Sequence, residues 1–111
     1  MKIEQSQQGT VLVLTPFGAL VDSDSTHFAD LLRKHLDKGN VKIIMDMNAV
    51  PFIESAGLEM LLDASEDAAA CGGGLRIVNP SDIVRDILMA TRLNSRIEMH
   101  KELADARRSL L

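Results

Sequence analysis

The sequence is short of the residues on which several kinds of site depend. It has one cysteine, Cys71, no tryptophan or tyrosine, and only three phenylalanines. A single cysteine permits neither an internal disulfide nor a cage of thiolates around a metal ion. The scarcity of aromatic rings leaves no stacking platform for single-stranded nucleic acid. A disulfide scaffold, a thiolate metal centre and single-strand binding are therefore excluded.

Excess positive charge and long apolar runs are missing as well. The formal net charge is −4, whereas nucleic acids and anionic membrane surfaces attract clustered lysine and arginine. No run approaches the roughly 20 apolar residues of a membrane-spanning helix, and residues 1–5 lack the apolar core of a signal peptide. We therefore expect a cytoplasmic protein without nucleic-acid or membrane partners, whose acidic side chains suit a partner with a basic face.

Residues that carry catalytic chemistry do not cluster with enzyme-like spacing. His27, His35 and His100 show no ligand spacing with one another or with Cys71, and no pair suggests a nucleophile with its base. The glycines at 72–74 lack the lysine and hydroxyl residue that complete a phosphate-binding loop. The sequence predicts no enzyme, no cofactor and no metal.

The 111 residues suit one domain, residues 1–111, with a single core. Apolar and β-branched runs predict strands, and 3.6-residue periodicity predicts helices between them. The order β-β-α-β-α-β-α-β-α indicates an α/β fold with a mostly parallel sheet, opened by an antiparallel hairpin. The strands are expected at 2–6, 10–15, 41–47, 75–78 and 96–99.

Helical spacing also predicts which side chains face the core, and capping residues predict where helices begin. Asp22 or Ser23 is expected to cap the first helix, and Ser81 the third. The inner faces are expected to be Phe28, Leu31, Leu32, His35 and Leu36 in the first helix; Leu58, Leu61, Leu62, Ser65 and Ala69 in the second; Ile83, Val84, Ile87, Leu88 and Thr91 in the third; and Leu103, Ala106, Arg107 and Leu110 in the last.

Ser55 occupies the position where the third strand and its loop give way to a helix. The first backbone N–H groups of a helix lack internal partners and carry partial positive charge. A serine oxygen there can cap them, and a phosphate on that oxygen is favoured by the same field. The spacing alone favours the cap.

The segment from Ile43 to Leu58, IIMDMNAVPFIESAGL, resembles the signature of STAS domains, in particular of bacterial anti-sigma factor antagonists. GALVD at 18–22 and LRIVNP at 75–80 resemble two further stretches of that family, so the resemblance covers essentially the whole chain. It implies a mixed sheet of four or five strands with helices mainly on one side.

The resemblance also implies a partner-switching role. The unmodified protein would bind a serine-kinase anti-sigma factor, which has a histidine-kinase-like ATPase fold, and so release a sigma factor. Phosphorylation of Ser55 would end that binding, and a PP2C-type phosphatase would reset it. Glu54 replaces the aspartate of the signature and Ala56 its second hydroxyl residue. The alternative is therefore an unswitched STAS scaffold in a transporter or stress-signalling complex.

Several residues around the signature are candidate contacts for the kinase, and we expect a monomer to make them. For three of them a plainer interpretation competes: Asp22 as a helix cap, Asp46 as an acceptor for loop N–H groups, and Glu54 as a solvated loop residue. Acidic residues at 59, 63, 66 and 67 predict an outward face, which in most helices is simply solvated. Because this face begins beside Ser55, our hypothesis is that it docks a basic surface of the partner. The full candidate set is Asp22, Asp46, Glu54, Ala56, Gly57, Glu59 and Asp63. A receiver-type phosphoacceptor at Asp46 is rejected, because Thr15-Pro16-Phe17 stands where an acidic pair is needed.

Overall fold

The computed structural model describes the backbone of residues 1–111 and all side chains except those of Asp22 and Ser23. One sheet contains five strands in the order β1-β2-β3-β4-β5. β1 runs antiparallel to β2, and each later strand runs parallel to the one before it. The predicted α/β class and mixed sheet are confirmed. The strands are β1 (Lys2–Gln8), β2 (Val11–Phe17), β3 (Lys42–Asp46), β4 (Gly74–Val78) and β5 (Glu98–His100).

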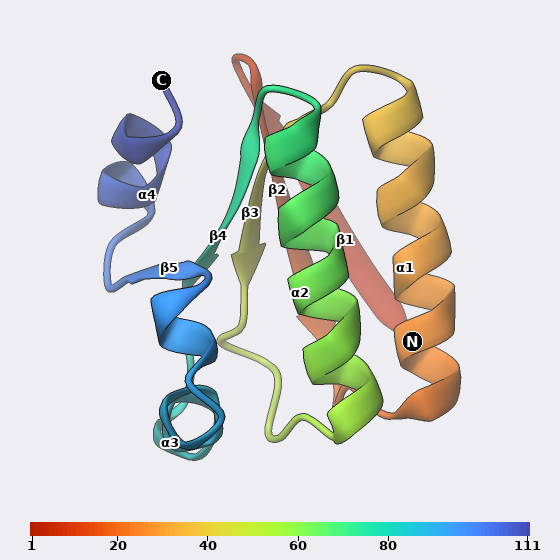
Figure 1. Ribbon diagram of the computed structural model, residues 1–111, viewed down its shortest axis with the longest axis vertical. Coiled ribbons are helices and arrows are strands. Elements are labelled where there is room, and N and C mark those ends of the chain that lie inside the picture. Colours follow the sequence, from red (N-terminus) through yellow and green to blue (C-terminus); the bar gives the residue numbers. More distant parts are fainter.

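The two long helices lie side by side over one face of the sheet, with α3 beyond one end and α4 beside β4 and β5 (Figure 1). The helices are α1 (Asp22–Asp37), α2 (Ser55–Ala70), α3 (Asp82–Ala90) and α4 (Leu103–Ser109), and a short 3-10 helix, η1 (Leu93–Ser95), follows α3. The long helices thus take one side, as expected.

Strand alternation divides the core between the two faces of the sheet. Leu14, Met45 and Ile77 face α1 and α2, where they pack with buried side chains such as Phe28 and Leu61. On the other face, alternate residues of the same strands pack with α4. This smaller cluster consists of Val11, Val13, Ile44, Val78, Ala106 and Leu110.

The predicted inner face of α2 is wrong by about one residue. Leu61 is buried and the half-buried Leu58 packs against the core, as expected, but Leu62 and Ser65 are only half-buried and Ala69 is exposed. Small residues turn toward the rest of the protein and let the helix approach closely. The buried residues are Gly57, Met60, Leu61, Ala64 and Ala68.

Fewer side chains of α1 and α3 are buried than predicted. In α1, Phe28, Leu32 and Leu36 are buried, as expected. In α3 only Val84 and Leu88 are buried. Ile83 is 62% exposed, because α3 covers one end of the sheet and buries a single line of side chains.

The N-termini of α1 and α3 and the position of β5 test the predicted boundaries. Ser81 Oγ accepts a hydrogen bond from Val84 N at 3.2 Å, which confirms that cap. Helix α1 has Val21 as its N-cap residue, one position earlier than predicted. The last strand begins at Glu98 rather than at residue 96, because Arg96 N and Ile97 N still donate to Leu93 O in the turn that follows η1.

Candidate functional site

The loop that carries Ser55 is fixed by backbone hydrogen bonds to the chain that follows β2. Leu20 N donates to Phe52 O at 3.2 Å, and Glu54 N donates to Leu20 O at 3.0 Å. These bonds form a parallel bridge between Leu20 and Ile53, both of which have buried side chains. The start of α2 is therefore held firmly against the body of the protein.

Gly57 is required by this close approach. A Cβ at this position would lie 2.7 Å from Ile53 Cγ2 and 2.9 Å from Leu20 O, which is closer than van der Waals contact allows. Only glycine leaves room for the bridge beneath the first turn of α2. Gly57 is itself buried, so the structure gives it a packing role, and its contact with a partner stays a prediction.

Ser55 is the first residue of α2, and its side chain is exposed. The expectation that it caps the helix is wrong. The N-cap residue is Glu54, whose side chain makes no capping hydrogen bond. Ser55 already lies within the helix, one position too late to serve as the cap. Its hydroxyl has no hydrogen-bond partner among the described residues.

The N-terminus of α2 favours a negative group on the oxygen of Ser55. The first amides of α2 have no partners within the helix, and its first turn contains no acidic side chain. A helix of 16 residues concentrates partial positive charge at this end. The arrangement can therefore accept a phosphate on an exposed hydroxyl without displacing any described side chain from a contact.

A groove between α1 and α2 begins beside Ser55. It comprises two adjoining cavities of about 290 and 150 Å³, which share Ala29, Met60 and Asp63. We call it the α1/α2 groove. Ala29 and Met60 give it an apolar floor, and four carboxylates line it. These are Asp30, Glu59, Asp63 and Asp67.

The acidic face predicted on α2 is divided by ion pairs. Asp67 pairs with Arg33 of α1 at 3.0 Å, and Glu66 pairs with Arg96 at 2.7 Å on the opposite flank of α2. Within the described part of the chain, Glu59 and Asp63 form no ion pair. On α2, these two carboxylates therefore provide the available negative charge of the groove, and Asp30 of α1, which also forms no ion pair among the described residues, adds to it.

The remaining candidates fall into different places. Asp46 Oδ1 accepts from Asn48 N at 3.0 Å, which confirms the loop-holding interpretation. The alternation of β3 puts Asp46 on the face of Ile44, away from the groove. The side chain of Asp22 lies outside the described residues. The site thus brings together Ser55, the exposed Glu54 and the groove residues Ala56, Glu59 and Asp63.

Sequence reasoning named Asp22, the first residue of α1, but missed the residues of α1 that line the groove. Ala29 and Asp30 line the groove, but placing them requires knowing that α1 lies beside α2. One local signal was available: the small residues Ser25 and Ala29 are four positions apart, next to the buried stripe of α1. Small residues in such a stripe indicate that another helix approaches closely.

Two further kinds of site find no support in the described part of the chain. No helix there is both long enough and apolar enough to cross a bilayer. Among the same residues, no three His, Cys, Asp or Glu side chains are grouped so that they could hold a metal ion.

Comparison with known proteins gives a family and several similar structures. The family model described as STAS domain matches residues 2–106. A candidate anti-sigma factor antagonist from Thermotoga maritima superposes with a TM-score of 0.92 at 21% sequence identity, covering 97% of this chain and 93% of that one. The phosphorylated form of the Bacillus cell fate determinant SpoIIAA gives a TM-score of 0.74 at 18% identity, covering 97% and 99%.

A third similar structure belongs to a much longer protein. The murine anion transporter Slc26a9 gives a TM-score of 0.78 at 20% identity, covering 94% of this chain but only 18% of the transporter. No curated protein sequence matches the chain at a significant level. At these identities the three structures show a shared fold.

Proposed function

Because the chain belongs to the STAS domain family, we propose that it is an anti-sigma factor antagonist switched by phosphorylation of Ser55. The unphosphorylated form binds a serine-kinase anti-sigma factor of histidine-kinase-like ATPase fold, and the sigma factor is released. The kinase then phosphorylates Ser55, the complex dissociates, and a PP2C-type phosphatase restores the binding form. We place this cycle in the cytoplasm and assign it to one monomeric domain of residues 1–111, without a cofactor.

The observation that carries this proposal is the exposed, unpartnered hydroxyl of Ser55 at the start of α2. Phosphorylation adds about −1.5 to −2 charges. The orphan amides of α2 stabilise such a charge, and the exposed hydroxyl has no hydrogen-bond partner among the described residues, so we expect the fold to be preserved. Modification then acts on binding rather than on folding.

A docked partner would meet the α1/α2 groove directly beside Ser55. Glu59 and Asp63 offer carboxylates that form no ion pair among the described residues, and Ala29 offers exposed apolar surface. We assign this groove to a basic segment of the kinase that has apolar side chains of its own. We also propose four further contacts with the kinase, at or near the same end of the molecule. These are Asp22, Asp46, Glu54 and Gly57.

Charge alone does not explain why phosphorylation would end such a complex, since a basic partner attracts a phosphate. The loss comes from bulk and from desolvation of the dianion where two surfaces pack closely. Each 1.4 kcal/mol of that cost weakens binding roughly tenfold. A single phosphate can thus separate the partners while the fold stays intact.

The decisive experiment incubates the protein with ATP and the serine kinase from the same genome. Intact mass and site mapping are compared between wild type and Ser55→Ala. One phosphate on wild type and none on the variant supports the proposal. An unmodified wild type, with the kinase active on another substrate, would assign the chain to the unswitched scaffolds.

The groove is tested separately by charge reversal. Glu59→Lys combined with Asp63→Lys is expected to weaken kinase binding at low salt by at least tenfold. The matched control reverses Asp86 and Glu102, which are exposed and lie outside the groove. Equal affinities of both double variants would remove the groove from the interface.

A further inference from the structure

A second cavity, of about 330 Å³, opens beyond the carboxyl ends of the parallel strands β4 and β5. Its lining contains none of the residues of the α1/α2 groove, and the proposed phosphoswitch makes no use of it. Open α/β sheets hold ligands beyond the carboxyl ends of their strands. The volume lies near the lower end of the range of small-molecule pockets, about 300 to 1,000 Å³. It suits a ligand of metabolite size.

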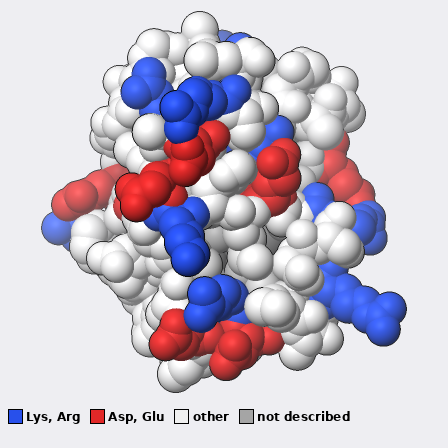
Figure 2. Space-filling view, turned by 90° about the vertical axis from the view of Figure 1, so that its left-hand side faces the viewer, with Lys and Arg blue, Asp and Glu red and all other residues white. Residues whose placement is uncertain are grey.

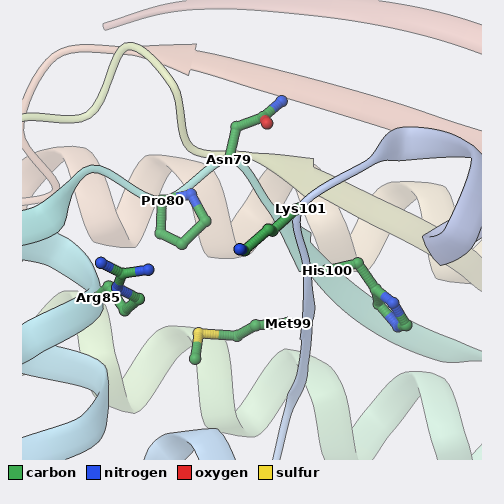
Figure 3. Close-up of a pocket in the computed structure, with 6 residues that line it drawn as sticks. All are labelled: Asn79, Pro80, Arg85, Met99, His100 and Lys101. Atoms are coloured by element: carbon green, nitrogen blue, oxygen red, sulfur yellow. The ribbon is translucent and has the colours of Figure 1, made fainter.

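Two cations face this cavity. Both Arg85 and Lys101 line it, and the side chain of Lys101 extends toward the side on which Arg85 lies (Figure 3). Arg85 pairs with Asp82 at 3.2 Å, but that carboxylate is 92% exposed, so the pair holds the guanidinium only weakly. Among the described residues, Lys101 has neither an ion pair nor a side-chain hydrogen bond. An anion between the two would relieve their mutual repulsion.

The part of the chain that forms this cavity has more basic than acidic side chains, unlike the part that forms the α1/α2 groove. Residues 71–111 contain seven basic and five acidic side chains, whereas residues 1–70 contain five and eleven. On the face formed by β5, α3 and α4, basic side chains lie interspersed with acidic ones (Figure 2). An anion can therefore approach this side without crossing the acidic α1/α2 groove.

The walls of the cavity are apolar. Pro80 presents its ring on one side and Met99 its thioether on the other (Figure 3). Both are half-buried, and methionine adapts its shape to what it packs against. The imidazole of His100 points away from the two cations. The lining therefore matches a ligand with one anionic end and a compact apolar body.

We propose that this cavity binds a small organic anion, a carboxylate or phosphate monoester, whose charge is held by Arg85 and Lys101 and whose apolar part packs between Pro80 and Met99. The planar guanidinium can donate two parallel hydrogen bonds to either kind of anion. The ammonium of Lys101 adds a mobile point charge.

Binding is measured by titrating the ¹⁵N-labelled protein and following its amide resonances. The probes are phenyl phosphate and benzoate, and benzyl alcohol is the neutral control. Saturable shifts at Asn79, Met99 and Lys101, with dissociation constants in the millimolar range, are expected for at least one anion. The anion that binds with the lower dissociation constant shows whether phosphate or carboxylate is preferred. No saturable shift with either anion up to about 10 mM overturns the proposal.

Substitutions separate this cavity from general surface charge and from the phosphoswitch. Arg85→Gln and Lys101→Gln are each expected to weaken the anion about tenfold, because each removes a charge-assisted contact. Arg107→Gln removes an exposed charge on α4 and should leave the affinity unchanged. Ser55→Ala should also bind as wild type does. Unaltered binding by both cavity variants, or equal binding of benzyl alcohol, would refute the proposal.

Discussion

Two serines stand at the starts of helices in this chain, and their hydroxyl groups differ in what they contact. Ser81 accepts a hydrogen bond from Val84 N, whereas Ser55 contacts no described donor or acceptor. The hydroxyl of Ser81 caps α3 and so contributes to the fold. The hydroxyl of Ser55 is free to be chemically modified, which is the property that a phosphoacceptor needs.

The two serines therefore should differ in their effect on stability. Ser81→Ala is expected to lower the free energy of unfolding by about 1 kcal/mol through loss of the cap. Ser55→Ala should change it by less than about 0.5 kcal/mol. Urea unfolding at constant m-value measures both. A loss of similar size at the two positions would mean that Ser55 also caps its helix.

His35, near the end of α1, makes stability depend on pH. Burial foremost, and then the charge of Lys38, lowers the pKa of His35 below 6.5. Nδ1 lies 3.4 Å from Asn40 Nδ2, and Nε2 is buried without a hydrogen-bond partner among the described residues. The folded state thus binds a proton less readily than the unfolded state does.

The pKa of His35 is lower in the folded state than in the unfolded state. The stability that the neutral imidazole gives the folded state is therefore fully present above pH 6.5. It is lost as the pH falls below that value. The unfolding free energy of wild type should therefore decrease more steeply on acidification than that of His35→Gln. Urea unfolding of both proteins over the same pH series measures the difference. An NMR titration of His35 with a midpoint at or above 6.5 would contradict it.

At the scale of helices and strands, the order of elements was predictable because each carries its own periodicity. The way in which the elements pack against one another was not predictable. The ion pairs Arg33–Asp67 and Arg96–Glu66 join residues 34 and 30 positions apart, and no local pattern contains them. The face of α2 was misjudged for the same reason: leucine spacing favoured one stripe, but close packing favoured small residues.

The close packing of α2 on the Leu20–Ile53 bridge predicts whether a substitution at Gly57 raises or lowers the free energy of unfolding. Helix propensity alone makes Gly57→Ala stabilising by up to about 1 kcal/mol. The clash with Leu20 O and Ile53 Cγ2 should outweigh this and destabilise the protein by about 1 to 3 kcal/mol. Thermal or urea unfolding decides between the two. A more stable variant would show that α2 can move away from the bridge at little cost.

At the scale of the whole molecule, charge is unevenly distributed along the chain. The first 70 residues hold eleven of the 16 acidic side chains, including all four that line the α1/α2 groove. A field of this kind steers a basic partner toward the groove during diffusion. It should therefore govern the rate of association more than the lifetime of the complex.

The association rate constant with the proposed kinase partner is expected to fall several-fold between about 0.05 and 0.5 M salt, as screening shortens the reach of these charges. The variant with Glu59→Lys and Asp63→Lys should associate more slowly at low salt and show a shallower dependence. Stopped-flow mixing measures both. A salt dependence equal to that of wild type would show that the charges of the groove do not steer the encounter.

The spatial order of the strands also bears on how the protein is made. Every strand after β1 pairs with the strand that precedes it in the chain, so no strand is inserted between two that already exist. Translation delivers the N-terminal segments first. Each strand that leaves the ribosome therefore meets a neighbour that has already been synthesised, after one turn or one helical connection. The sheet can grow at one edge in step with synthesis.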